Sequence, residues 1–269
     1  MERIQSAIAK ARAARDRLAP DGTRPTGTAT DHDPKAAAWA ALAPFTPKPR
    51  HLSRNRLVAG EDCDNAIPFD ILRTRMLREL ATHGWRRVAV TSPDAGCGKS
   101  TLTANLALSL SRQAQVRTLL AEFDLRRPSQ ARMWGLDRPV RFAEALAAGR
   151  AAESELVRVG ENLALGLNQG AVGRASELLT APATGAALDR LDRLLAPTVT
   201  LFDLPPALRT DDTLAFLDRV DCTLIVAEAE VTTREALDLC EREVSRHRPV
   251  LGIVLNKLRH VDKAYGYGY

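Results

Sequence analysis

The residues of this sequence best suited to chemistry form one stretch, residues 91–101, which reads TSPDAGCGKST. Gly96 and Gly98 can adopt backbone angles that a side chain would forbid, so neighbouring N–H groups can point at one anion. Lys99 is placed to reach the β- and γ-phosphates of a nucleotide, and Ser100 offers a hydroxyl to Mg²⁺. The stretch therefore predicts a phosphate-binding loop, with contacts expected from Asp94, Ala95, Gly96, Cys97, Gly98, Lys99, Ser100 and Thr101.

The elements around this loop must present it at the edge of a sheet. An apolar run, residues 88–90, precedes the loop, and apolar residues at helical spacing follow it from 102 to 110. Strand, glycine-bearing loop and helix in that order is the context that such a loop requires. The alternative is a glycine-rich turn that ends in GKS by chance, and Pro93 stands where the strict pattern has glycine.

Three acidic residues lie at the ends of two further predicted strands. Glu122 and Asp124 close the apolar run 116–123, and Asp203 follows the run 198–202. Ligands of doubly wound sheets sit at the carboxyl ends of the strands, and hard oxygen atoms beside phosphates suit Mg²⁺. For any one of these acids taken alone, ordinary capping of a strand end is the alternative.

Two polar residues close the last predicted strand, residues 250–255. The carboxamide of Asn256 carries a donor and an acceptor in one plane and can pair with an adenine edge. Lys257 follows it. Without the phosphate loop, an Asn after a strand would indicate only a turn, but beside the loop we expect both residues to contribute to nucleotide binding.

All three tyrosines of the chain, Tyr265, Tyr267 and Tyr269, lie in its last five residues and alternate with glycine. Aromatic side chains usually go where their ~150–250 Å² can be buried, and terminal segments pack least. A hydroxyl on such a tether can enter an active site, so we expect these tyrosines to accept phosphate. The alternative is a tail that adds to a neighbouring surface.

Strand and helix patterns alternate along most of the remaining chain. This alternation predicts an α/β fold with a doubly wound, mostly parallel sheet. Further strands are expected at 87–91, 163–167 and 222–227, helices at 69–80, 176–179, 186–195 and 233–244, and a looser helical region up to residue 159. The expected organisation is a basic amphipathic helix at 1–19, a Pro-rich linker at 20–64, the nucleotide-binding domain at 65–258 and the tyrosine-rich tail at 259–269.

The composition limits the classes of protein to which the chain can belong. A length of 269 residues with 45% hydrophobic residues allows a sizeable core. The four cysteines, which show no CxxC spacing, indicate reduced thiols of a cytoplasm. No apolar run approaches the ~18–20 residues of a membrane span. A solvated surface explains the net charge of +5 as well as an anionic partner does, and we expect no nucleic acid partner.

Taken together, these motifs resemble the bacterial tyrosine kinases of capsule and exopolysaccharide synthesis, the CpsD/CapB family. The matching stretches are TSPDAGCGKST, LLAEFDLRRPS (119–129), SELL (176–179), TLFDLPP (200–206), GIVLNK (252–257) and the tyrosine tail. The resemblance covers about residues 67–269. It implies a phosphate-loop NTPase of the MinD/ParA-like fold, a tyrosine-kinase domain over 65–258, and ATP and Mg²⁺ as cofactors.

The resemblance also implies roles for single residues. Lys99 and Ser100 would bind phosphate and Mg²⁺, Asp124 and Asp203 would hold the metal with Ser100, and Glu122 would take the tyrosine proton. The family further implies a ring-like homo-oligomer whose subunits phosphorylate one another's tails and so regulate polysaccharide polymerisation and export. A separate membrane chain-length determinant protein would activate it at the cytoplasmic face of the cell membrane.

The sequence departs from that family at three places. Glu122 stands where Asp is usual, and Cys97 replaces a commoner acidic or small residue. The helix that reads ExxRxxR in the family has Ile67, Asp70 and Arg73 at those three positions, so only the second arginine is kept.

These departures leave two rival interpretations open. A partitioning ATPase of the MinD/ParA type shares the fold, but such proteins carry a lysine where this chain has Asp94. The missing lysine and the tyrosine tail favour the kinase. A degenerate kinase that binds nucleotide and regulates polysaccharide assembly without chemistry is the second rival, which Glu122 and the altered helix keep open.

Overall fold

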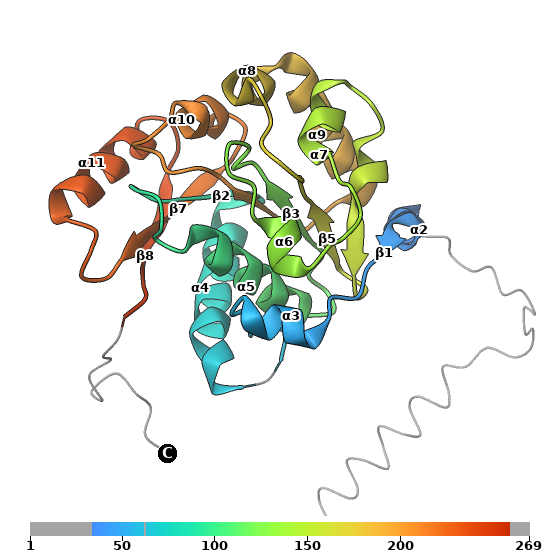
Figure 1. Cartoon of the computed structure of the whole chain (residues 1–269), viewed down its shortest axis with the longest axis horizontal. Helices are drawn as coiled ribbons and strands as arrows, with labels where there is room; N and C mark the ends of the chain where they lie inside the picture. The colour runs from blue at the N-terminus through green and yellow to red at the C-terminus, as the bar shows by residue number, and fades with distance from the viewer. Residues whose placement is uncertain (1–33, 62, 259–269) are drawn as a thin grey trace, which may run out of the picture. The chain divides into compact units, whose positions relative to one another are not determined.

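The computed structural model describes residues 34–61 and 63–258 of the chain. These residues form an eight-stranded sheet in the order β1-β4-β5-β3-β6-β2-β7-β8 (Figure 1). Neighbouring strands are parallel except β4 and β5, which are antiparallel. The strands are β1 (Ala43–Pro44), β2 (Arg87–Thr91), β3 (Thr118–Glu122), β4 (Val157–Val159), β5 (Leu163–Gly166), β6 (Val199–Asp203), β7 (Cys222–Glu228) and β8 (Val250–Asn256).

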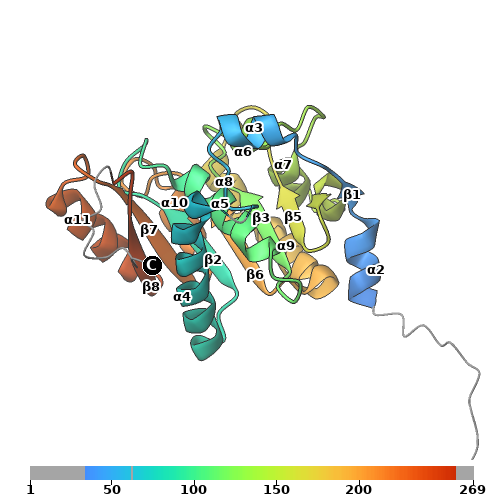
Figure 2. The same cartoon turned by 90° about the horizontal axis from the view of Figure 1, so that it is seen from below.

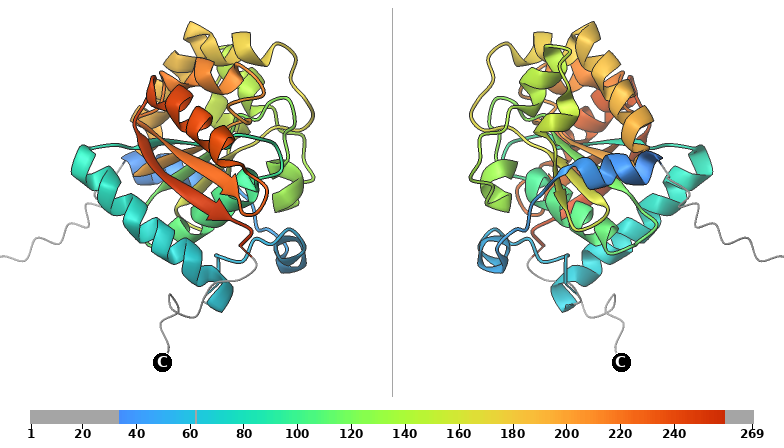
Figure 3. Two further views of the ribbon diagram at one scale, coloured as in Figure 1. Left: turned by 90° about the vertical axis from the view of Figure 1, so that its left-hand side faces the viewer. Right: turned by 90° about the vertical axis from the view of Figure 1, so that its right-hand side faces the viewer.

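Helices cover both faces of the sheet (Figures 1 and 2). One face carries α4 and α5, and the other carries α7, α9, α10 and α11 (Figure 3). The α-helices are α2 (Pro34–Ala41), α3 (Pro49–Arg54), α4 (Ile67–His83), α5 (Lys99–Ser111), α6 (Gln130–Trp134), α7 (Phe142–Ala147), α8 (Ala175–Thr180), α9 (Pro182–Leu195), α10 (Asp212–Leu217) and α11 (Arg234–Ser245). Two 3₁₀ turns, η1 (Asp64–Ala66) and η2 (Ala152–Glu155), complete the described elements.

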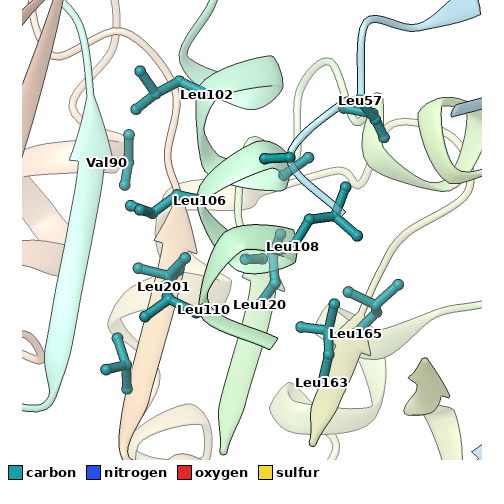
Figure 4. Close-up of a cluster of buried hydrophobic side chains, with 14 of the residues drawn as sticks. Leu57, Val90, Leu102, Leu106, Leu108, Leu110, Leu120, Leu163, Leu165 and Leu201 are labelled. Carbon is teal, nitrogen blue, oxygen red and sulfur yellow. The ribbon is translucent and has the colours of Figure 1, made fainter. Parts of the chain in front are cut away.

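The central strands are buried on both sides because helices lie above and below them. All five residues of β3 and of β6 are buried. On the α5 side, Leu106 and Leu110 of the helix lie in one cluster with Leu120 and Leu201 of these strands (Figure 4). This packing fixes the start of α5, and with it the phosphate loop, against the carboxyl ends of the strands.

The sheet confirms the predicted fold class, a doubly wound and mostly parallel α/β sheet. The helix expected from 69 to 80 is α4, and it ends at Gly84, whose positive φ of 69° forms its left-handed cap. Outside the predicted linker, two described elements were not expected: β4, which lies inside the region predicted as helical, and α10. Both are short, and β4 exists because it pairs with β5 and β1, a partnership that local sequence does not encode.

The predicted linker, residues 20–64, is folded over most of its described part. The indole of Trp39 in α2 is 2% exposed, and its Nε1–H donates to the carbonyl oxygen of Leu195 at 2.7 Å. The following strand, β1, pairs with β4. Residues 34–61, which the sequence assigned to a linker, therefore pack onto the sheet, because Trp39 is buried and β1 pairs with β4.

Two predicted segments, the helix at 1–19 and the tyrosine tail at 259–269, lie outside the described residues. Within the described ranges, no helix combines the length and apolar character that crossing a membrane requires.

Candidate functional site

The predicted phosphate loop connects β2 to the first turn of α5. Gly96 and Gly98 have φ angles of 91° and 85°, in the left-handed region that favours glycine. A Cβ atom on Gly98 would lie 2.3 Å from Nδ2 of Asn256, so a side chain does not fit there. The same Nδ2 donates to the carbonyl oxygen of Cys97 at 2.8 Å. Asn256, at the end of β8, therefore packs against the loop at Gly98 and is hydrogen-bonded to it at Cys97.

A cavity of about 610 Å³ opens beside this loop. Its wall combines the loop and the start of α5 with the segments that follow β3 and β6, so it lies at the carboxyl ends of the strands as predicted. The lining residues are Asp94, Ala95, Gly96, Lys99, Ser100, Asp124, Arg126, Arg127, Ser129, Pro205, Pro206, Arg209 and Thr210.

Lys99 contributes a positive charge to the lining of the cavity. Its Nζ lies 2.7 Å from Oδ2 of Asp124, and both side chains are about nine-tenths buried. Burial alone would lower the pKa of Lys99, but the carboxylates of Asp203 and Asp124 outweigh it and hold the pKa above its ordinary value. The lysine therefore stays charged. Phosphate oxygens of a bound nucleotide would contact Lys99 beside Asp124 or in place of it.

Asp203, at the end of β6, is fully buried next to this pair. Its Oδ2 accepts a hydrogen bond from Nε2 of Gln130 at 2.8 Å, while its Oδ1 accepts none from any described residue. Burial raises the pKa of Asp203, although the charge of Lys99 opposes the shift. A buried oxygen without a partner is costly, and a cation beside it would remove that cost.

The residues present fit a magnesium ion. The hydroxyl of Ser100 and the carboxylates of Asp124 and Asp203 are hard oxygen donors, as Mg²⁺ requires. No group of three His, Cys, Asp or Glu side chains able to hold a metal occurs among the described residues. In proteins Mg²⁺ usually keeps several waters and binds through one or two carboxylates together with phosphates of the substrate.

Glu122 has a different environment from the one its predicted role requires. Its side chain is fully buried, and it does not line the cavity. Oε1 accepts the backbone N–H groups of Ser129 and Gln130 at 2.6 and 2.7 Å, and Oε2 accepts the N–H of Asn168 at 2.9 Å. Burial raises the pKa of Glu122 to about 8, even though these three donors favour the ionised form.

These contacts differ from those expected of a group that takes the proton of a tyrosine, and that role of Glu122 stays a prediction. Both of its oxygen atoms accept backbone N–H groups, and the residue does not line the cavity. The additional methylene of Glu relative to Asp carries the carboxylate to the start of α6. Glu122 therefore holds three segments together, the end of β3, the start of α6 and the segment after β5.

Sequence reasoning missed two residues that organise the site. Gln130 donates from Nε2 to Asp203 and to the carbonyl oxygen of Ser100, at 2.8 and 3.0 Å, and so ties the phosphate loop to β6. Asn168 donates from Nδ2 to the carbonyl oxygen of Glu122 at 2.8 Å. Neither residue belongs to a motif with known chemistry, so no signal in the sequence distinguishes them from solvent-facing amides.

The other predicted nucleotide contacts have mixed outcomes. Asn256 braces the loop through Nδ2, and its contact with adenine stays a prediction. Lys257 pairs with Glu228 at 2.8 Å. The buried thiol of Cys97 lies 3.3 Å from the carbonyl oxygen of Asp94, inside the loop. Thr101 lies in the first turn of α5 and does not line the cavity.

Comparisons with known proteins identify a family and several relatives that are similar to this chain in sequence and fold. A family model described as the CobQ/CobB/MinD/ParA nucleotide binding domain matches residues 88–266. The chain belongs to this family. Within it, the chain is 30% identical over 203 residues to EpsB of Ralstonia nicotianae, a tyrosine-protein kinase by name. The match covers 73% of this chain and 26% of EpsB, so the chain spans about a quarter of that relative's length.

Solved structures of the family give the same assignment. The BceF tyrosine kinase domain has a TM-score of 0.60 and 25% identity, covering 70% of this chain and 75% of that one. MinD from Pyrococcus horikoshii, solved with Mg-ADP, has a TM-score of 0.54 and 19% identity, covering 66% and 72%. At that identity it shows the fold alone. The resemblance to bacterial tyrosine kinases is thus confirmed, as is the predicted phosphate-loop fold.

Proposed function

We propose that this member of the CobQ/CobB/MinD/ParA family is an ATP-dependent protein-tyrosine kinase that phosphorylates tyrosines of its own tail. The observation that carries the proposal is the cavity in which Lys99, Ser100 and Asp124 meet beside the phosphate loop. The names of the relatives and the restriction of every tyrosine to residues 265–269 support it.

The reaction transfers the γ-phosphoryl group of ATP to a tyrosine oxygen. The bond between the γ-phosphorus and the bridging oxygen breaks, a bond to the phenolic oxygen forms, and ADP leaves. Lys99 and the loop N–H groups stabilise the charge on the phosphate oxygens. The phenolic proton passes to a carboxylate of the site: Asp124 lines the cavity, whereas Glu122 would first have to release its three N–H donors. Mg²⁺ held by Ser100, Asp124 and Asp203 would neutralise phosphate charge.

The proposal also covers the oligomer in which the kinase acts, the process it regulates and its membrane partner. The tail would react in a neighbouring subunit of a homo-oligomer, and the reaction would regulate polymerisation and export of an exopolysaccharide or capsule. A separate chain-length determinant protein in the membrane would activate the kinase and hold it at the inner face of the cell membrane. The family resemblance supports each of these statements.

The test is an incubation of the full chain with Mg·ATP followed by mass spectrometry of the tail. We expect phosphate on Tyr265, Tyr267 or Tyr269, and a loss of about 10²–10³-fold in Lys99→Met because a positioned cation is removed from the transition state. Lys48→Met, which removes an exposed lysine, is the matched control. Phosphate on Ser or Thr alone, or on no residue even with a membrane activator, would contradict the proposal.

Transfer between subunits needs its own experiment. A Lys99→Met chain is mixed with a chain in which all three tail tyrosines are Phe, so neither can phosphorylate itself. Phosphate on the Lys99→Met chain in a verified mixed oligomer shows transfer between subunits. Its absence, with the wild-type chain active, would show transfer within one subunit.

A second candidate function is a nucleotide-binding regulator without kinase chemistry. The enclosed carboxylate of Glu122 favours it, because this residue occupies the position of the family's Asp and its oxygen atoms accept backbone N–H groups. If this is the function, the unmodified chain binds Mg·ATP but transfers no phosphate to the tail under any condition.

A further inference from the structure

We propose that Arg126, Arg127 and Arg209 form a binding site for a phosphotyrosine, beside the position of the tyrosine that reacts. We call these three residues the mouth arginines. The inference rests on the proposed kinase function and deepens it, because it states which form of the tail the site prefers. A tail that already carries one phosphate would be the better substrate.

The mouth arginines come from two segments that follow strands of the sheet. Arg126 and Arg127 follow β3, and Arg209 follows β6, and all three line the cavity that also holds Lys99 and Ser100. The loop N–H groups and Lys99 supply the usual contacts of a nucleotide triphosphate. The three guanidinium groups that also line the cavity are therefore available to a second anion.

Two of the mouth arginines are held in place by carboxylates. Arg126 donates through Nε and Nη2 to the two carboxylate oxygens of Asp212, at 2.6 and 3.0 Å. Asp212 is fully buried, whereas half of the Arg126 side chain, 51%, is exposed. Arg209 pairs through Nε with Asp94. A guanidinium has five N–H donors, so both arginines keep donors for a ligand and are oriented in advance.

Arg127 is the third mouth arginine, and its charge is unbalanced. Its backbone N–H donates to Oδ1 of Asp124 at 3.2 Å, which anchors the residue beside the Lys99–Asp124 pair. Its guanidinium is exposed and makes no hydrogen bond or ion pair with any residue that the structure describes. Because Asp212 and Asp94 balance the other two, Arg127 supplies the net positive charge that would attract a phosphate.

The tail offers a phosphate at a suitable spacing. Tyr265, Tyr267 and Tyr269 are each separated by one glycine, and in an extended chain alternate side chains share one side. Two residues of extended chain span about 7 Å. A sphere with the volume of the cavity, 610 Å³, is about 10 Å across, so one tyrosine at the reacting position leaves its phosphorylated neighbour within the same cavity.

The consequence is an order of events within the tail. The first phosphate on any tyrosine creates a ligand for Arg127, and this ligand holds the next tyrosine near the γ-phosphate of ATP. Binding of the phosphate is charge-assisted and bidentate, which makes it stronger than the contacts of an unmodified phenol. Later transfers to one tail would then be faster than the first.

The first test measures binding without transfer. The full chain is saturated with Mg²⁺ and a β,γ-imido analogue of ATP, which fills the phosphate loop and cannot donate its phosphate. Fluorescent peptides of residues 259–269, unphosphorylated or phosphorylated on Tyr267, are then titrated by anisotropy. We expect the phosphopeptide to bind about tenfold more tightly, and Arg127→Ala to abolish the difference. Arg242→Ala, which removes an exposed arginine of α11, should leave it unchanged.

The second test measures transfer with ATP to the same two peptides. We expect a lower KM for the phosphopeptide, with that advantage lost in Arg127→Ala. If no transfer occurs but the Arg127-dependent preference remains, the proposed kinase function fails and the anion site stands. If transfer occurs with equal affinity for both peptides, the anion site is overturned. A loss of analogue affinity in Arg127→Ala would also overturn it, since the arginine would then serve the nucleotide.

Discussion

The phosphate-loop edge of the sheet and the exposed surface of α4 differ in how their charged residues are used. At the loop, Lys99 and Asp124 face a cavity in which a ligand can replace their mutual contact. On α4, at the positions of the family's ExxRxxR motif, Arg73 donates from Nη1 to Oδ1 of Asp70 at 3.0 Å and to the carbonyl oxygen of Ser109 at 2.9 Å. Its charge is used within the subunit.

Two exposed residues of α4 are apolar, one of them at a motif position where the family has charge. Ile67, at the first motif position, is 52% exposed, and Ile71, one turn later, is 45% exposed. Asp70 also pairs with Arg112 at 2.8 Å, so the second motif position is bound to α5. The chain thus keeps the family's motif residues Lys99, Ser100 and Asp124 at the cavity and differs from the family on α4.

The largest effect is expected from Asp203→Asn, which tests the cavity side. The substitution removes a buried charge, so the free energy of unfolding should stay unchanged or rise. It also removes a metal ligand, so we expect tail phosphorylation to fall by about 10²-fold or more. Urea denaturation and initial rates at increasing Mg²⁺ decide this. Transfer at the wild-type rate with unchanged dependence on Mg²⁺ would show that Asp203 is only a strand end.

Glu122→Gln is expected to lower the stability of the fold and to leave phosphoryl transfer unchanged. The amide group replaces one carboxylate oxygen by a donor, which opposes one of the three N–H groups that Glu122 now accepts. We expect the free energy of unfolding to fall by roughly 3 kcal/mol, while the folded fraction keeps both nucleotide binding and tail phosphorylation.

Glu122→Asp provides the companion experiment. A shorter carboxylate leaves the N–H groups of Ser129 and Gln130 without a close acceptor, so we expect it to destabilise as well. If Glu122→Gln is fully stable yet transfers no phosphate, Glu122 is the base after all, and the contacts seen here open during the reaction.

Gln130→Leu tests the link between the loop and β6. It removes the donor to Asp203 and to the carbonyl oxygen of Ser100, leaving buried acceptors without partners. We expect a loss of roughly 2 kcal/mol in unfolding free energy and a higher Mg²⁺ concentration for half-maximal nucleotide binding. Gln169→Leu, at an exposed position, is the control. An unchanged Mg²⁺ requirement would limit Gln130 to a structural role.

The smallest effect is expected from Arg73→Ala, on the α4 side. Because Arg73 pairs within the subunit and its side chain is 14% exposed, we expect a loss of about 1 kcal/mol in stability and no change in oligomeric mass. Light scattering after size-exclusion chromatography measures the mass. Ile71→Asp, which places a charge at an exposed apolar position of α4, should reduce the mass if copies associate there. Dissociation by Arg73→Ala at unchanged stability would show that the arginine faces a partner.

The sequence by itself determined the fold class and the position of the phosphate loop. The order of strand, glycine loop and helix around residues 91–101 is a local pattern, and local backbone requirements such as those of Gly96 and Gly98 can be inferred from residue type. The acidic ends of β3 and β6 followed from the same logic, since carboxyl ends of neighbouring parallel strands meet at one edge.

Only the tertiary structure decided what each carboxylate does. Glu122 and Asp124 are two residues apart, yet one accepts three N–H groups from α6 and the segment after β5, and the other faces the cavity. Which donors surround a side chain depends on segments that are distant in sequence, so no local pattern reports it. The folding of residues 34–61 onto the sheet and the internal pairing of Arg73 have the same cause, because each depends on partners that only the packed chain brings near.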